Sequence, residues 1–223
     1  MPLPRLLLAA LCLWATCAHA QTRCCAPPRT PEEALFRSIE NGDHAEFSRL
    51  LGAGVSVSSR NPQGETPLYF AAEKGEIEMA RSLIARGADA KALTPNGETV
   101  LHAASMIESA ALMKDLIDAG ADVNAANKDG ETPLQWAALT GTFLAVKALA
   151  DAGADINVQD ARAGNTPLHA AVSHDDIVLI HYLLSKNART DIRNNEGLTA
   201  LELAQSRGRG SVKLFEPQDA PRP

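Results

Sequence analysis

Apolar residues along this chain come in short paired stretches separated by polar residues. In one pair, the stretch from Leu68 to Ala72 is followed, after Gly75, by a second apolar stretch that contains Leu83 and Ile84. Because glycine interrupts helices and favours turns, such a pair predicts two short helices joined by a tight turn.

The paired pattern returns five times at a nearly constant period. Each copy begins with a glycine two residues before a threonine, and successive copies start 33, 33, 34 and 33 residues apart. A fixed period in this range predicts a solenoid of stacked units. The copies begin at Gly64, Gly97, Gly130, Gly164 and Gly197.

The residue types at the helix ends support these units. Thr66 is suited to cap the first helix of its unit, and Pro67 fits the first helical position, where no backbone N–H is needed. Gly87 is suited to end the second helix in the left-handed conformation that residues with a Cβ resist. Asn187 takes the place of that glycine in the fifth unit, and asparagine is the usual second choice there.

Two motifs recur in register inside the units. One is Thr-x-Leu followed by a polar residue, which is a histidine at His102 and His169, and the other is Gly-Ala-Asp after the second helix. Thr-Pro-Leu-His at this period resembles the ankyrin repeat. The resemblance implies an all-α fold, an ankyrin-repeat solenoid of helix-turn-helix units with β-turn fingers between them.

The repeat frame divides the whole chain. An N-terminal cap fits the frame without a Thr-Pro pair at the expected place, and Gly208 and Gly210 shorten the last helix pair into a C-terminal cap. The predicted segments are a signal peptide 1–20, a Cys/Pro-rich leader 21–30, an ankyrin-repeat domain 31–216 and a disordered tail 217–223. The domain comprises a cap 31–63, repeats 64–96, 97–129, 130–163 and 164–196, and a C-cap 197–216.

The first twenty residues have the pattern of a cleaved signal peptide. Arg5 precedes a short apolar run, and Ala18 and Ala20 supply the small residues that a signal peptidase accepts. The alternative, a membrane anchor, needs about 20 apolar residues, and the run is shorter. A lipoprotein signal does not fit the residues before Cys17. We therefore expect a periplasmic or secreted protein that is not inserted in a membrane after cleavage.

Cysteine usage agrees with export, because the predicted mature chain keeps only Cys24 and Cys25 and the repeats contain no thiol. A bridge between adjacent cysteines is strained. The pair is therefore open to a disulfide with another chain, to disulfide exchange, or to an inert or locally bridged state in the leader. Apart from such a disulfide, we expect a monomer.

Composition and charge narrow the class of partner. Residues are 45% hydrophobic but only 4% aromatic, which suits a core of Ala, Leu, Ile and Val in close-packed short helices. The net charge of −6 becomes −7 when Arg5 leaves with the signal. This charge disfavours a nucleic acid or an anionic membrane as partner.

Candidate chemistry is sparse. The ankyrin resemblance implies that His102 and His169 are structural, with imidazoles hydrogen-bonded to backbone between repeats. The one local group of metal-ligand types is His174, Asp175, Asp176 and His181, but Asp175 stands where glycine turns the helix pair. We expect no enzyme, metal or cofactor, and keep a metal-dependent enzyme at this group as an alternative.

A solenoid presents an extended concave surface, or groove. If each threonine is counted as position 1, the ankyrin resemblance places positions 8 and 9 on this groove. Met106, Ile107 and Leu139 are large and apolar there, which predicts a protein-binding patch. The alternative is that Glu108, standing where the turning glycine belongs, bends the third unit and tucks Met106 or Ile107 inward. The other residues at these places include Lys74, Thr140 and His174.

Other residues complete the predicted protein-binding surface. Trp136 belongs to an alternation of large and small residues along the units, with Phe70, Ala103 and Ala170, so it is either a packing residue or part of the site. Lys128 and Asp129 would lie on the finger rim together with Arg162, which occupies the one-residue insertion of the 34-residue unit.

A signal followed by a short array resembles bacterial periplasmic ankyrin proteins, which are associated with supporting partner enzymes, including catalase in oxidative-stress defence. We therefore expect an exported scaffold that holds another protein on its concave face. An alternative is an immunity-type protein that neutralises a toxin entering the periplasm.

Overall fold

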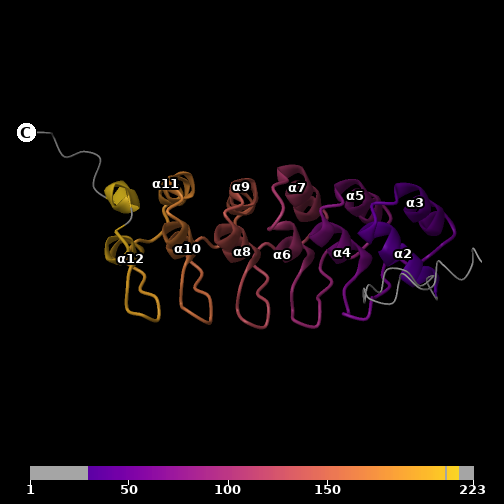
Figure 1. The fold of residues 1–223 in the computed structure, drawn as a ribbon, viewed down its shortest axis with the longest axis horizontal. Helices are drawn as coiled ribbons and strands as arrows, with labels where there is room; N and C mark the ends of the chain where they lie inside the picture. The colour runs from indigo at the N-terminus through magenta and orange to yellow at the C-terminus, as the bar shows by residue number, and fades with distance from the viewer. Residues whose placement is uncertain (1–29, 209, 216–223) are drawn as a thin grey trace, which may run out of the picture.

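The computed structural model describes residues 30–208 and 210–215, which form a single row of helix pairs without strands (Figure 1). The predicted signal peptide, the leader up to residue 29 with Cys24 and Cys25, and the predicted tail 217–223 lie outside the described residues. No helix in the described ranges is long and apolar enough to span a bilayer.

The row contains six units, each with an inner helix followed by an outer helix. Figure 1 shows the inner helices in one layer, the outer helices in a second layer, and the connecting segments, here called fingers, extending from the inner layer. The pairs are α2 Pro31–Glu40 and α3 His44–Gly52; α4 Pro67–Lys74 and α5 Ile77–Ala85; α6 Val100–Ala104 and α7 Ala110–Asp118; α8 Pro133–Thr140 and α9 Phe143–Asp151; α10 Pro167–His174 and α11 Ile177–Ser185; α12 Ala200–Ser206 and the 3₁₀ helix η2 Gly210–Phe215.

The inner helices begin where the threonines predict. The Thr66 hydroxyl accepts the Tyr69 N–H at 3.3 Å, and Pro67 fills the first turn. The first unit has the same signal after all, because Thr30 caps α2 and Pro31 follows it. The Thr-Pro pair stands outside the repeat frame because α2 is longer than α4, with ten residues against eight, and because the turn from α2 to α3 is also longer than the turn from α4 to α5.

The turns between paired helices also follow the prediction. Gly75 and Gly141 end α4 and α8 in the left-handed conformation, with φ of 74° and 73°. Asp175 does the same for α10 at φ 53°, and Asn187 closes α11 at φ 63°. These two are the only residues other than glycine with positive φ in the described chain.

The third unit departs from this pattern at Glu108. No left-handed residue ends α6, which stops at Ala104, and the chain continues through a looser turn before Ser109 caps α7. A side chain with a Cβ disfavours the left-handed conformation that glycine supplies in neighbouring units. The predicted difference in bending is therefore present, and it shortens the inner helix to five residues.

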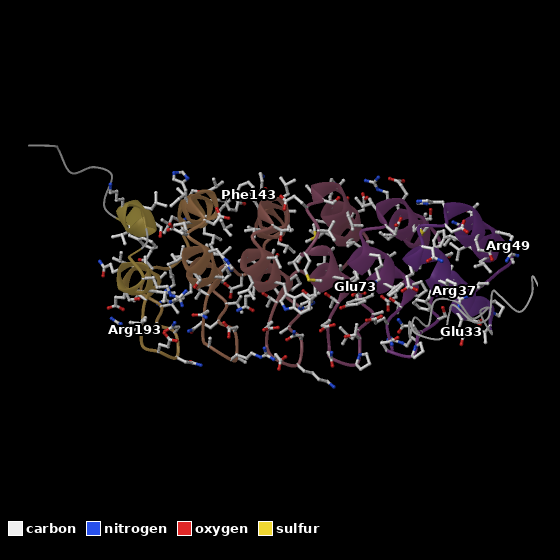
Figure 2. The ribbon with its side chains drawn as sticks, viewed as in Figure 1. Glu33, Arg37, Arg49, Glu73, Phe143 and Arg193 are labelled. Atoms are coloured by element: carbon white, nitrogen blue, oxygen red, sulfur yellow. The ribbon has the colours of Figure 1, made fainter. Side chains whose placement is uncertain are left out.

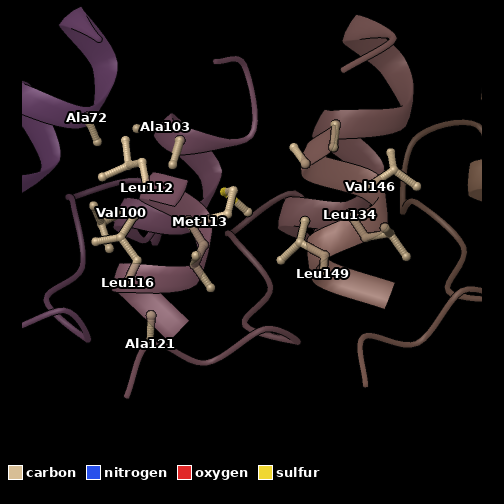
Figure 3. Packing of buried hydrophobic residues seen from close by; sticks show 14 of the residues in the cluster. Ala72, Val100, Ala103, Leu112, Met113, Leu116, Ala121, Leu134, Val146 and Leu149 are labelled. Atoms are coloured by element: carbon tan, nitrogen blue, oxygen red, sulfur yellow. The ribbon is translucent and has the colours of Figure 1, made fainter. Parts of the chain in front are cut away.

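Small and branched aliphatic side chains fill the space between the layers. Figure 3 shows Val100, Leu112 and Leu116 packed within the third unit, and Leu134 and Leu149 within the fourth. All five are at most 2% exposed. Alanines let the inner helices approach closely, so leucines from facing helices interdigitate at high density. The predicted aliphatic core is confirmed.

Polar and aromatic contacts join units at the outer layer and at the fingers. Figure 2 shows Phe143 in the outer layer, where its ring meets Tyr182 edge to face at 5.4 Å. Arg193 lies in the last finger and pairs with Glu202 at 2.6 Å. Each unit is therefore tied mainly to its neighbours.

Candidate protein-binding surface

The polar residue after Thr-x-Leu links each inner helix to the next finger. His102 Nδ1 accepts the Thr99 N–H at 3.0 Å, and its Nε2 donates to the Glu131 carbonyl of the next unit at 3.0 Å. His169 repeats this arrangement with the Leu198 carbonyl. Burial lowers the pKa of both imidazoles, which keeps them neutral. The predicted structural role of the two histidines is confirmed.

Other polar side chains supply the same link where histidine is missing. Gln135 accepts the Thr132 N–H at 2.8 Å and donates to the Val158 carbonyl at 3.3 Å. In the second unit the Tyr69 hydroxyl donates instead to the Glu98 carboxylate at 2.7 Å. The fingers are thus held in fixed positions relative to the inner helices.

A small hollow lies between the fourth and fifth units, where the fingers meet the inner helices; this finger-side surface is called the groove below. Trp136, Leu139 and Ala170 supply its apolar wall, and Glu131 and Asp160 supply carboxylates. Leu139 is 59% exposed, although it sits on a helix whose other face is fully buried. The remaining lining residues are Gln135, Asn165 and Thr166.

Trp136 is fixed at the edge of this hollow. Its indole Nε1 donates to Glu131 Oε2 at 2.9 Å, and the His102 ring meets the indole edge to face at 5.2 Å. Trp136 is half-buried, so it both packs against the preceding unit and faces the groove. The two roles considered for it from the sequence are compatible in this geometry.

The carboxylates of the hollow are bound by neutral donors. Glu131 also accepts from Asn127 Nδ2 at 3.1 Å, while Asp160 accepts the backbone N–H groups of Ala163 and Asn165 at 2.6 and 2.9 Å. Within the described ranges, no basic side chain pairs with either carboxylate. The negative charges of Glu131 and Asp160 are therefore available to pair with a cation from another molecule.

The apolar patch predicted from the eighth and ninth positions is only partly assembled. Met106 is 40% exposed, but Ile107 is half-buried and its Cδ1 lies 3.7 Å from where a Cβ on Gly75 would be. The short α6 explains the difference, because both residues lie in the turn after its end. The structure groups Leu139 with Trp136 in the hollow, whereas Met106 lies outside it.

Glu108 has a contact that sequence reasoning missed. Its Oε1 accepts the Leu144 N–H at 3.0 Å, which caps the outer helix of the next unit. Beside it, the Thr142 hydroxyl donates to the Ser105 carbonyl. The signal was present in the sequence, because a carboxylate at the glycine position is placed to reach a helix N-terminus.

Several other predicted site residues make contacts within the array. Lys74 Nζ lies 4.9 Å from the centre of the Phe70 ring. The Thr140 hydroxyl donates its hydrogen to the Trp136 carbonyl at 2.9 Å, within the same helix. His174, the last residue of α10, is exposed. The structure does not place these three side chains in the hollow.

The predicted rim residues lie on the fingers. Arg162 Nη2 pairs with Asp129 Oδ2 at 3.5 Å, which links the inserted residue to the preceding finger. Lys128 is exposed, and its backbone N–H donates to the Asn96 carbonyl at 2.9 Å. The fingers therefore contact one another at the rim as well as at their bases.

The two aspartates of the histidine and aspartate group around α11 make structural contacts. Asp176 caps α11 by accepting the Leu179 N–H at 3.0 Å, and Asp175 accepts the Ser211 N–H at 3.1 Å. Across the part of the chain that the structure describes, no three His, Cys, Asp or Glu side chains gather as metal ligands would. The geometry gives the metal-enzyme alternative no support.

Comparisons with known proteins agree with this geometry. Family models for ankyrin repeats match residues 78–160 and 146–219, in a three-copy form, and residues 50–104, in a many-copy form. Among solved structures, the chain is similar to the ankyrin repeat domain of Bcl-3, a member of the IkappaB protein family. The identity is 30%, the TM-score is 0.69, and the match covers 78% of this chain and 80% of that one. No curated protein matches the chain.

Proposed function

Because the chain belongs to the ankyrin-repeat family, whose repeats typically mediate binding to other proteins, we propose that it is an exported scaffold that holds a partner protein in the groove. The observation that carries this proposal is the hollow. A large aliphatic side chain, Leu139, stands exposed beside a fixed Trp136, with carboxylates at its edge. An aromatic anchor beside apolar surface is typical of the centre of a protein interface.

The rigidity of the surrounding surface supports the same function. His102 and Gln135 fix two successive fingers to the inner helices, so the walls of the groove are formed before a partner arrives. A preformed surface loses less conformational entropy on association than a flexible one. Binding without large rearrangement is therefore expected.

Export and the kind of partner rest on the sequence. Residues 1–20 have the pattern of a signal peptide, which supports a periplasmic or secreted location. The resemblance to periplasmic ankyrin proteins supports a partner enzyme such as a catalase, and an incoming toxin is the other partner considered.

The proposal can be tested by photo-crosslinking in cells that produce the full chain. A photoreactive phenylalanine analogue is placed at Leu139 in the groove. The matched control places it at Lys114 on the outer helix α7, where the lysine side chain is 72% exposed. A protein adduct formed from position 139 and not from position 114 supports the proposal, and mass spectrometry identifies the adduct.

The outcomes separate the alternatives. A resident enzyme in the adduct supports the enzyme-supporting role, whereas an adduct that forms only when an antagonistic strain supplies a toxin supports immunity. Adducts from position 114 alone would contradict binding in the groove. Cell fractionation of the same strain tests export, because retention of the chain in the cytoplasm would contradict it.

A further inference from the structure

We propose that the hollow between the fourth and fifth units receives an arginine side chain from an extended basic segment of the partner. This inference rests on the proposed function and specifies the chemistry of the partner. The hollow combines an apolar wall, formed by Trp136, Leu139 and Ala170, with the carboxylates of Glu131 and Asp160. An arginine matches both parts at once.

Charge is the first reason. Glu131 and Asp160 come from successive fingers, line the same hollow, and accept hydrogen bonds only from neutral groups among the described contacts. Arg162, a cation on the same finger as Asp160, is bound to Asp129. A cation that enters the hollow therefore meets two carboxylates in a partly desolvated site, where charge attraction exceeds that at an open surface.

The shape of the wall selects arginine over lysine. The methylene stem of the guest would cover Leu139 and Ala170, and its head would lie beside the Trp136 indole. A guanidinium is planar, stacks on aromatic rings and is more weakly hydrated than an ammonium group, so it loses less on leaving water. Its fork of N–H donors can also bind a carboxylate while the ring contact is kept.

A row of carboxylates along the finger bases can bind the rest of the segment. Glu65 and Glu98 precede the capping threonines of the second and third units, just as Glu131 precedes that of the fourth. Both are half-buried at the finger bases, and their hydrogen-bond partners are neutral: Asn61 for Glu65 and Tyr69 for Glu98. Further basic residues of an extended segment would meet these two carboxylates in turn.

The test uses fluorescence anisotropy with a labelled peptide that alternates arginine and alanine, added to the full chain. A second peptide carries citrulline, the neutral isostere of arginine, at the same positions. We expect the arginine peptide to bind, with the citrulline peptide weaker by about tenfold or more and the affinity falling with salt. Equal binding of both peptides would overturn the inference.

Two double variants test where the peptide binds. Glu131→Gln/Asp160→Asn removes both charges of the hollow. The introduced glutamine retains an acceptor for Trp136, and the introduced asparagine retains one of the two acceptor oxygens of Asp160, as asparagine supplies a single acceptor oxygen at this place in three other fingers. Glu78→Gln/Asp118→Asn makes the same charge change on the outer helices α5 and α7. We expect about a tenfold loss with the first variant and none with the second.

The outcomes distinguish this inference from the proposed function. Equal losses with both variants would show attraction to net charge alone and would overturn the arginine site. An adduct at position 139 without binding of the arginine peptide would refute the arginine site and leave the scaffold role standing. If neither the adduct nor the peptide complex forms, both proposals fail.

Discussion

The contact between neighbouring fingers gives the sharpest stability prediction. Gly164 has φ 66°, and a Cβ there would lie 2.6 Å from Asn195 Oδ1 and 3.0 Å from the Asn195 backbone nitrogen. Gly197 occupies the same place in the last finger, with φ 76° and nothing within 4 Å of a Cβ. The two glycines share the same backbone constraint and differ in the neighbour.

This difference separates two costs of adding a methyl group. Gly197→Ala places a residue with a Cβ in the left-handed conformation and should lower the free energy of unfolding by about 1 kcal/mol. Gly164→Ala carries that cost and must also displace Asn195 of the next finger, whose side-chain oxygen and backbone nitrogen both lie too close to the new Cβ, which adds about 1 to 3 kcal/mol. We expect Gly164→Ala to be the more destabilising by that margin.

The assay is urea unfolding followed by circular dichroism. Gly87→Ala is a second control, because Gly87 lies inside the array at φ 80° with nothing within 4 Å of a Cβ. It separates the effect of the neighbouring finger from fraying of the last unit. If Gly164→Ala costs no more than either control, the fingers do not pack against each other as described, and the reasoning is refuted.

Three further predictions follow from the contacts of the inner and outer helices. Burial lowers the pKa of His102 and His169, so the unfolded state binds more protons and the free energy of unfolding should fall as pH drops below about 6.5, the unperturbed pKa. The variant His102→Gln/His169→Gln should flatten this pH dependence, measured by urea unfolding between about pH 5 and 7. Glu108→Ala removes the acceptor for the Leu144 N–H, so we expect a cost of about 1 kcal/mol and faster hydrogen exchange at that amide. Thr132→Ala removes an N-cap and should cost about 1 kcal/mol in thermal unfolding.

Each of these has a result that contradicts it. An unchanged pH dependence of stability in the double histidine variant would mean that groups other than His102 and His169 cause it. Slow exchange at Leu144 after the Glu108 substitution would mean that the carboxylate is not the cap; Glu78→Ala on α5 is the control for loss of a surface carboxylate. No change in melting temperature with Thr132→Ala would contradict the assigned start of α8.

The repeating elements could be predicted from the sequence because their determinants are local. Threonine followed by proline sets a helix start, and Gly75 or Asn187 sets a helix end, each through the conformation of one or two residues. The same reasoning anticipated that Glu108 would disturb the third unit. It could not say which of Met106 and Ile107 turns inward, because the path of the looser turn depends on packing with Gly75.

The hollow could be predicted only in part. The positions of Trp136 and Leu139 on the inner helix predict their place at the groove, but Asp160 reaches the hollow through the fold of the next finger. The fingers share one feature, because Asn61, Asn127, Asp160 and Asn194 each accept backbone N–H groups that close their own finger. This signal stands five or six residues before the capping threonines and was readable from the sequence.

The short α6 has a consequence for how the array bears mechanical load. Stretched from its ends, a solenoid acts as springs in series, since each unit contacts only its neighbours. Aliphatic surfaces can slide before they part, whereas hydrogen bonds fail over a short extension. At the junction between the third and fourth units α6 presents only five residues, and bonds from Thr142 to the Ser105 carbonyl and from Leu144 to Glu108 add to the finger links found along the array. Load on this junction therefore falls less on sliding apolar surface and more on bonds that break early.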